Sequence, residues 1–376
     1  MNGSIEKRKN QSWKLTVEMG RDENGKRLRK YETVKGPKKE AERRLRELLT
    51  NLDKGIPINT SKATVGQFLN QWLRDYAETN TSPRTVEGYK EVVNRYLVPS
   101  FGRVPLTKLT PQHVQGLYRD MLDRGLSPQT ILHAHRIFSE SLGHAVKWGL
   151  LMRNVCEAVD PPRPKRKEMN TLDPSEVRKL LDVSSGTTYG AVIFIALYTG
   201  LRRGEILGLR WVDVDLKNRT ISVTQTLTYL KGKGLVFGEP KTAYSRRLVT
   251  LPSDAVALLG GLRVKQKEQL QESSGQWEES RLVFGSPNGK PVHPDSVTKA
   301  FGKIIKRSGL PHVRFHDLRH THATLMLKQG VHPKIVSERL GHASVNITLD
   351  TYSHVLPNMQ EEAALAFEEV LADTVV

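Results

Sequence analysis

The 376-residue chain lacks three features that would place a protein in a membrane or outside the cell. It has one cysteine, Cys156, so no disulfide can form within the chain. Its longest apolar run, residues 191–198, is far shorter than the roughly 20 residues that a membrane-spanning helix needs. The first residues lack the apolar run of a secretory signal. We therefore expect a protein of a reducing compartment, the cytoplasm, with no membrane partner.

Carboxylates are scarce relative to cations. The chain has 58 Lys and Arg against 40 Asp and Glu, a formal net charge of +18. Residues 1–62 alone hold 17 Lys and Arg against 9 Asp and Glu, a net charge of +8. Such an excess is typical of proteins that bind a polyanion, because cations docked on phosphates release counterions. Nucleic acid is the expected partner, and a basic protein without such a partner is the alternative.

Residues 1–62 predict a small sheet backed by one helix. Alternating apolar residues, the pair Asn24-Gly25 and a second extended run as far as Val34 indicate a hairpin. The alternating residues are Trp13, Leu15, Val17 and Met19. After Gly36-Pro37 the apolar spacing changes to a helical period. Its members are Ala41, Leu45, Leu48, Leu49 and Leu52.

Residues 63–162 predict a bundle of four or five short helices. Each expected helix start has a capping residue near a proline or a polar turn. The four starts are Thr64, Ser82, Thr110 and Ser127. Residues 161–167, PPRPKRK, cannot continue a helix, because proline lacks the amide donor. We interpret the basic stretch 163–170 as a linker that either follows a phosphate backbone or stays solvated.

Residues 171–376 are expected to be mainly helical, beginning with a helix capped at Asp173. Two β-rich segments, Thr220–Val223 and Arg247–Leu251, flank a glycine-rich turn at 231–234 and predict a short antiparallel sheet. The expected fold class of the whole chain is mainly α with small β-sheets.

Four clusters in this last region carry cations and hydroxyls with hardly any carboxylates. They are residues 199–205 (TGLRRGE), 240–242 (PKT), 316–320 (HDLRH) and 340–342 (LGH) followed by Tyr352. A pocket of this composition suits a phosphodiester, since in-line attack on phosphorus places negative charge on the non-bridging oxygens. Guanidinium groups can bind those oxygens bidentately, whereas an ammonium group acts as a point charge.

The four clusters occur in the same order as in the tyrosine recombinases of the phage integrase family, which this chain resembles. The resemblance is strong over residues 170–376 and weaker over the residues that precede them. The chain is most similar to integrases of phages and conjugative transposons that carry an N-terminal arm-binding domain. The resemblance implies four parts: an arm-site DNA-binding domain (1–62), a helical core-site DNA-binding domain (63–162), a basic linker (163–170) and a catalytic domain with a C-terminal tail helix (171–376). The tail helix would pack on its own domain or on a neighbouring protomer.

The resemblance also implies a role for each matching residue. Arg202 and Arg319 would hold the scissile phosphate, and Tyr352 would attack it, leaving a 3′-phosphotyrosine and a free 5′-hydroxyl. Lys241 would protonate the leaving oxygen. His316 would act as the base that takes the proton of the tyrosine. His342 would donate a hydrogen bond to a phosphate oxygen. The division of acid and base roles between Lys241 and His316 stays open.

Other residues near these clusters carry weaker expectations. Glu205 would support Arg202, or would be an ordinary charge on the helix surface, and Arg203 is expected to be solvated. His320 and His322 are expected to pack or cap within their helix. His316 and His320 have the spacing of a zinc-binding helix, but no third ligand is evident, so we expect neither a metal nor another cofactor. The surrounding cations should favour the phenolate of the attacking tyrosine.

The implied function is a site-specific DNA recombinase that integrates, and with help excises, a mobile genetic element without ATP. Its partners would be core-type and arm-type sites on double-stranded DNA, three further copies in a homo-tetramer, and an excisionase or a host DNA-bending protein. It would work in the bacterial cytoplasm, associated with the nucleoid. Three alternatives stay open: a relaxing topoisomerase of type IB, a catalytically inactive DNA-binding regulator, and a metal-dependent nuclease, which would need more carboxylates.

Overall fold

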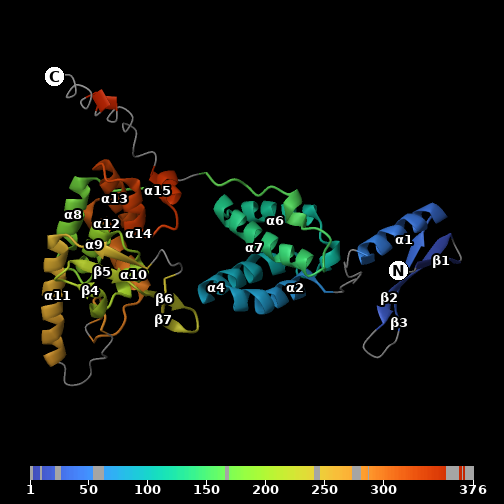
Figure 1. Ribbon diagram of the computed structural model, residues 1–376, viewed down its shortest axis with the longest axis horizontal. Helices are drawn as coiled ribbons and strands as arrows, with labels where there is room; N and C mark the ends of the chain where they lie inside the picture. The colour runs from blue at the N-terminus through green and yellow to red at the C-terminus, as the bar shows by residue number, and fades with distance from the viewer. Residues whose placement is uncertain are drawn as a thin grey trace. The chain divides into compact units, whose positions relative to one another are not determined.

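The computed structural model describes residues 3–8, 11–21, 27–53, 63–165, 169–240, 246–272, 281–286, 288–352, 364–365 and 367–368. The chain divides into two compact units, Met1–Arg166 and Lys167–Val376 (Figure 1). Its elements are mostly helices, and its strands form three small antiparallel sheets among the described residues. The expected fold class is therefore confirmed.

The first unit begins with a three-stranded sheet packed on one helix. The elements are β1 (Gly3–Arg8), β2 (Ser12–Arg21), β3 (Arg27–Lys35) and α1 (Lys38–Asp53). The predicted hairpin is confirmed as β2 and β3, with Trp13 opposite Val34. Leu15 and Val17 of β2 are buried against apolar residues of α1. The edge strand β1 was not predicted, because its sequence is almost entirely polar. Asn24 and Gly25 lie outside the described residues.

The rest of the first unit is a helical bundle. Its α-helices are α2 (Val65–Trp72), α3 (Glu78–Asn80), α4 (Pro83–Val92), α5 (Val98–Phe101), α6 (Pro111–Asp123) and α7 (Pro128–Lys147). Between them lie π-helical turns η1 (Leu73–Ala77) and η2 (Val93–Leu97) and 3₁₀ turns η3 (Leu106–Lys108) and η4 (Val155–Ala158). The four predicted start residues, Thr64, Ser82, Thr110 and Ser127, each precede a helix as its N-cap. The bundle has its own apolar core between residues 65 and 156.

The helices of the second unit include one that is apolar along almost its whole length. They are α8 (Pro174–Ser184), α9 (Gly190–Thr199), α10 (Arg203–Leu207), η5 (Trp211–Asp213), α11 (Ser253–Glu272), α12 (Pro294–Ser308), α13 (Asp317–Lys328), α14 (Pro333–Leu340) and α15 (Val345–Tyr352). The longest apolar run of the chain forms α9, which packs against α8, α10, α11 and α13. No helix among the described residues is long and apolar enough to cross a membrane. As predicted, Asp173 caps the start of α8.

The strands of the second unit form two sheets where the sequence predicted one. One sheet joins β4 (Val214–Asp215), β5 (Thr220–Val223) and β8 (Arg247–Thr250), so the predicted pairing of the two β-rich segments is confirmed. The glycine-rich turn does not belong to this sheet. It closes a separate hairpin of β6 (Thr226–Leu230) and β7 (Gly234–Gly238). Gly232 and Gly234 adopt φ of 82° and 78°, which explains why this turn contains glycine.

Two other predicted segments are described only in part. Residues 163–165 and 169–170 of the predicted linker form no helix or strand, and residues 166–168 lie outside the described residues. In the predicted tail helix, the four described residues are helical, and the side chains of Leu365 and Phe367 are exposed.

Candidate active site

A cavity of about 530 Å³ in the second unit brings the predicted cluster together. Six of the seven predicted site residues line it: Arg202, Glu205, His316, Arg319, His342 and Tyr352. They come from α10, from the start of α13, from the turn after α14 and from the end of α15. Lys241 lies outside the described residues, although the preceding Pro240 lines the cavity.

Arg202 is placed by a glycine turn. Helix α9 ends at Gly200, which adopts φ of 66°, and Arg202 then acts as the N-cap of α10. A Cβ atom at Gly200 would lie 2.6 Å from a methyl carbon of Leu340, so the turn has no room for a side chain. The Arg202 side chain is 39% exposed and donates from Nη1 to Glu205 Oε1 at 2.8 Å. Its guanidinium is therefore held from one side and accessible from the other.

Glu205 is a buried carboxylate shared by two arginines. It is 5% exposed, so it is not a charge on the helix surface. Besides Arg202, it accepts a hydrogen bond from Nη2 of Arg247 at 2.9 Å. Burial alone raises the pKa of Glu205, but the hydrogen bond and charge of Arg247, with the charge of Arg202, hold it below its usual value. The carboxylate is therefore ionised and fixes both guanidinium groups.

Arg247 was not predicted as part of the site. Its side chain is 6% exposed, and Nε donates to the carbonyl oxygen of Arg339 at 2.7 Å. It lies at the first position of β8 and follows the segment that carries Lys241. No local sequence signal distinguishes it from Arg246, because its partners lie 42 and 92 residues away.

Arg319 is a buried cation held by backbone carbonyls. It is 3% exposed and donates to the carbonyl oxygens of Gly200 at 2.8 Å and Leu340 at 2.6 Å. Burial and the neighbouring Arg202 lower the pKa of Arg319 to about 9, with Glu205 opposing the change. Both hydrogen bonds go to neutral groups, so its charge remains available to an anion in the cavity.

Two histidines of the cavity are neutral at pH 7. Burial lowers the pKa of His316 to about 4, with His320 and Arg319 adding to the effect. Burial and nearby arginines, Arg319 first, lower the pKa of His342 to about 4. The Nδ1 atom of His342 lies 2.8 Å from the hydroxyl oxygen of the buried Thr348, which fixes the orientation of the ring. Each neutral imidazole can donate one N–H to a bound oxygen.

Tyr352 is the last residue of α15, and its hydroxyl contacts His320, which was expected to pack or cap within its own helix. The side chain is 1% exposed, and its Oη lies 2.8 Å from Nδ1 of His320. The charge of Arg319 favours the phenolate, as expected, but burial has the larger effect. Burial raises the pKa of Tyr352 to about 12, and the charge of Arg319 opposes it only in part. The hydroxyl is therefore protonated and needs a base before it can attack.

The remaining side chains near the cluster are structural. His322 is buried as predicted: Nδ1 lies 2.7 Å from the carbonyl oxygen of Leu197, and Nε2 accepts from Arg339 at 3.1 Å. Arg203 is not simply solvated as expected, because it donates to the carbonyl oxygen of Pro294 at 3.1 Å. Among the described residues, no group of three or more His, Cys, Asp or Glu could hold a metal ion.

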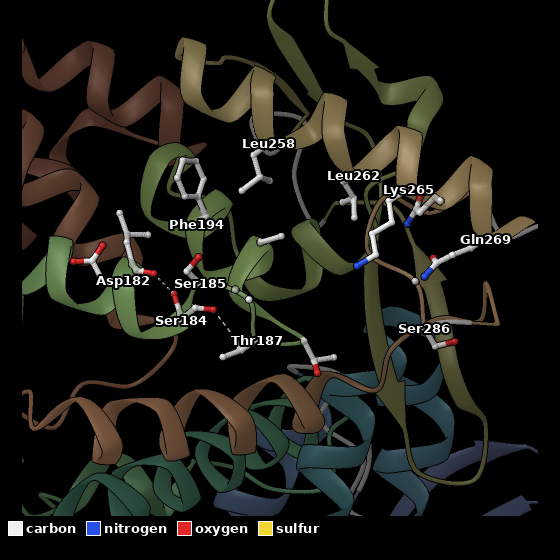
Figure 2. Close-up of a pocket in the computed structure, with 17 residues that line it drawn as sticks. Asp182, Ser184, Ser185, Thr187, Phe194, Leu258, Leu262, Lys265, Gln269 and Ser286 are labelled. Atoms are coloured by element: carbon white, nitrogen blue, oxygen red, sulfur yellow. Dashed lines mark hydrogen bonds between the residues drawn. The ribbon is translucent and has the colours of Figure 1, made fainter.

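A larger cavity, of about 780 Å³, lies between the end of α8, the start of α9 and α11 (Figure 2). Its described lining carries one cation, Lys265, and one carboxylate, Asp182, and otherwise consists of polar and apolar side chains. Hydroxyls there bond to nearby carbonyls, such as Thr187 to Ser184. The concentration of positive charge that suits a phosphodiester is in the smaller cavity.

Comparisons with known proteins agree with this chemistry. The model of the "Phage integrase family" matches residues 170–359, and that of "Phage integrase, N-terminal SAM-like domain" matches residues 64–122. A XerC-like tyrosine recombinase of Caldanaerobacter subterraneus is 31% identical, with 93% of this chain and 94% of that protein covered. The ICEBs1 integrase of Bacillus subtilis is 27% identical over 98% of this chain and 100% of its own length.

A solved structure of similar fold is the Tn1549 transposon integrase in complex with a circular intermediate DNA. It has a TM-score of 0.68 and 21% identity, and the match covers 82% of this chain and 99% of that one. The family model covers half of the sequence, including all four clusters, and the XerC-like relative covers nearly the whole chain. The chain therefore belongs to the phage integrase family, the site-specific tyrosine recombinases, which are enzymes that cut and rejoin DNA strands.

Proposed function

We propose that this chain is an integrase that cuts DNA through Tyr352 and a covalent 3′-phosphotyrosine. The Oη–P bond forms as the bond from phosphorus to the 5′ oxygen breaks, and the leaving oxygen takes a proton from Lys241. The phosphotyrosine is itself an activated ester. A 5′-hydroxyl of a partner strand can attack it and reseal the DNA without ATP.

The observation that carries this proposal is the convergence of six predicted residues on one cavity. Arg202 and Arg319 would hold the non-bridging oxygens, where negative charge grows during attack. His316 and His342 would each donate an N–H to the phosphate. Glu205 would keep Arg202 in position without neutralising the buried Arg319, whose hydrogen bonds go to carbonyl groups.

We further propose that the parts of the chain divide the DNA between them. Residues 63–162 and 171–376 would bind the core-type site, with 163–170 as the basic linker between them. Residues 1–62, with their net charge of +8, would bind separate arm-type sites. Because the substrate is DNA, the enzyme would work in the bacterial cytoplasm, associated with the nucleoid.

The relatives support a mobile element as the biological context. They include the ICEBs1 integrase and integrases of mycobacterial and staphylococcal phages. A lambda integrase of similar fold was solved as a tetramer bound to a Holliday junction, with a TM-score of 0.57. We propose the same stoichiometry here, with an excisionase or a host DNA-bending protein setting the direction of the reaction.

The test uses a nicked duplex that carries the junction between the encoding mobile element and its host chromosome. A nick near the cut site lets a short fragment escape and traps the covalent complex. We expect a denaturant-resistant adduct with the peptide that contains Tyr352. Tyr352→Phe should remove the adduct and leave the gel shift unchanged. An adduct on another residue, or none with the wild-type chain, would contradict the proposal.

The division of DNA binding needs a separate experiment. Deleting residues 1–62 should abolish the gel shift of arm-type DNA and spare both core-site binding and adduct formation. Equal loss of both activities would overturn this part of the proposal. Exchange between two marked duplexes distinguishes a recombinase from an enzyme that only relaxes DNA.

A further inference from the structure

The hydrogen bond of the Tyr352 hydroxyl points to a base other than the one expected from the sequence. Its Oη lies 2.8 Å from Nδ1 of His320, a distance at which a proton can pass between the two atoms. The two residues are 32 positions apart and meet because α13 and α15 both pack against α14, around a shared apolar cluster. Since Tyr352 is 1% exposed, bulk water has little access to its hydroxyl.

His316 has a different position in the same cavity. Its ring stands edge-on to that of His320, with the ring centroids 5.2 Å apart. Among the described residues, the hydrogen bond of the tyrosine hydroxyl goes to His320. His316 lies next to the arginines that would hold the phosphate, and their charges add to the lowering of its pKa. We therefore assign His316 to hydrogen bonding with the phosphate, since the tyrosine hydroxyl contacts His320.

His320 can accept a proton because of the groups around it. Burial lowers its pKa, Asp317 raises it, and Arg319 and Arg314 lower it further, so the imidazole is neutral at pH 7. His316 and the Tyr352 ring also contact it. Asp317 is 3% exposed, and its charge would stabilise the imidazolium that forms when the proton arrives.

We propose that His320 is the general base of this enzyme, taking the proton from Tyr352 as the hydroxyl attacks the scissile phosphorus. The inference rests on the proposed function. The O–H bond of the tyrosine breaks and an N–H bond forms at Nδ1, which requires the tautomer with its hydrogen on Nε2. The Oη–P bond forms while the bond to the 5′ oxygen breaks. On resealing, the imidazolium returns its proton to the departing phenol oxygen.

The test measures deprotonation of Tyr352 separately from protonation of the leaving group. A nicked junction duplex with a bridging 5′-phosphorothiolate releases a thiolate, which leaves without a proton, so the rate of adduct formation reports activation of Tyr352. We compare His320→Asn with His316→Asn between pH 6 and 9, using the full chain. His320→Asn should form the adduct at least about 100-fold more slowly at pH 7. Its rate should rise about tenfold per pH unit, because hydroxide then replaces the base.

The control variant separates the two histidines. His316→Asn should also be slower, since His316 lines the phosphate cavity, but its rate should stay as flat with pH as that of the wild-type chain. As a second measurement, added imidazole should restore adduct formation by His320→Ala. A gel shift on the same duplex verifies that each variant is folded.

The outcomes separate the inference from the proposed function. An adduct on Tyr352 with the wild-type chain, together with an unchanged rate and pH profile for His320→Asn, would overturn the inference alone. A steep pH dependence in His316→Asn with a flat one in His320→Asn would reassign the base to His316. Failure of the wild-type chain to form any adduct would instead overturn the proposed function.

Discussion

Replacing Glu205 by glutamine tests how the cationic cavity is held together. The substitution keeps the shape of the side chain but removes the charge shared by Arg202 and Arg247. Arg247 is 6% exposed, and the substitution would remove the negative charge of Glu205 beside this buried cation. Breaking a buried ion pair from one side costs roughly 3–5 kcal/mol. Because glutamine retains one acceptor oxygen, we expect a loss near the lower end, about 3 kcal/mol.

A matched surface pair provides the control. Lys334 and Glu338 form an ion pair at 3.2 Å in the same unit, with side chains 62% and 65% exposed. Glu338→Gln should cost at most about 0.5 kcal/mol. Because a chain of several units need not unfold in one step, native-state hydrogen exchange of the α10 and β8 amides is the appropriate measurement. Equal protection in Glu205→Gln and Glu338→Gln would refute the argument.

The pH dependence of the Glu205→Gln effect gives an independent check. The pKa of Glu205 in the folded chain lies below its usual value of 4.5, because its two arginines outweigh burial. A lowered folded-state pKa stabilises the fold fully above the unfolded-state value, and this stabilisation is lost as pH falls through the folded-state value. The difference between wild type and Glu205→Gln should therefore be constant near neutral pH and shrink below about pH 4.5. A constant difference down to pH 3 would show that charge is not the cause.

Two further substitutions test other contacts of the site. Gly341→Ala should destabilise the second unit by more than the roughly 1–2 kcal/mol that a left-handed alanine costs, because its Cβ would lie 2.9 Å from Nη1 of Arg247. Gly330→Ala, with φ of 73° and open space around it, should cost only that strain, and equal denaturation midpoints for the two variants would contradict this view. Thr348→Val should remove the hydroxyl partner of His342 and slow adduct formation with the gel shift intact. An unchanged rate would mean that Thr348 does not orient the histidine.

The elements that could be predicted from the sequence are those with local causes. The caps at Thr64 and Asp173 are visible because capping requires particular residues at short spacing. The pairing of β5 with β8 was also recognisable, since both strands are rich in β-branched residues. By contrast, β1 is polar and owes its strand structure to pairing with β2. Such an edge strand has no apolar face by which a single sequence could identify it.

The partners of the site residues were harder to predict because they depend on packing. Motif spacing indicated which residues gather, but not that His320, rather than His316, contacts Tyr352. The buried Arg247 could not be found either, as Glu205 and Arg339, which it contacts, are distant from it in sequence. The net direction of the Tyr352 pKa shift could not be predicted for a related reason. The sequence reveals the number of nearby cations, whereas the dominant effect is burial of the side chain among residues of α13 and α14.

Two buried arginines of the site, Arg319 and Arg247, donate hydrogen bonds to carbonyl groups at the ends of helices. Helices α9 and α14 both end in glycine turns, and the last carbonyl groups of a helix have no partner within it. Arg319 donates to Gly200 and Leu340 at these two ends, and Arg247 donates to Arg339 in the last turn of α14. Helix C-termini carry a partial negative charge, which stabilises a guanidinium without cancelling it as a carboxylate would. The buried carboxylate of Glu205 bonds to Arg202 and Arg247, whereas the hydrogen bonds of Arg319 go to backbone carbonyls. The same hydrogen bonds therefore satisfy the free carbonyl groups at the helix ends and the N–H groups of the buried arginines. The positive charge of Arg319 is not cancelled by a carboxylate, and it faces the cavity that contains Tyr352.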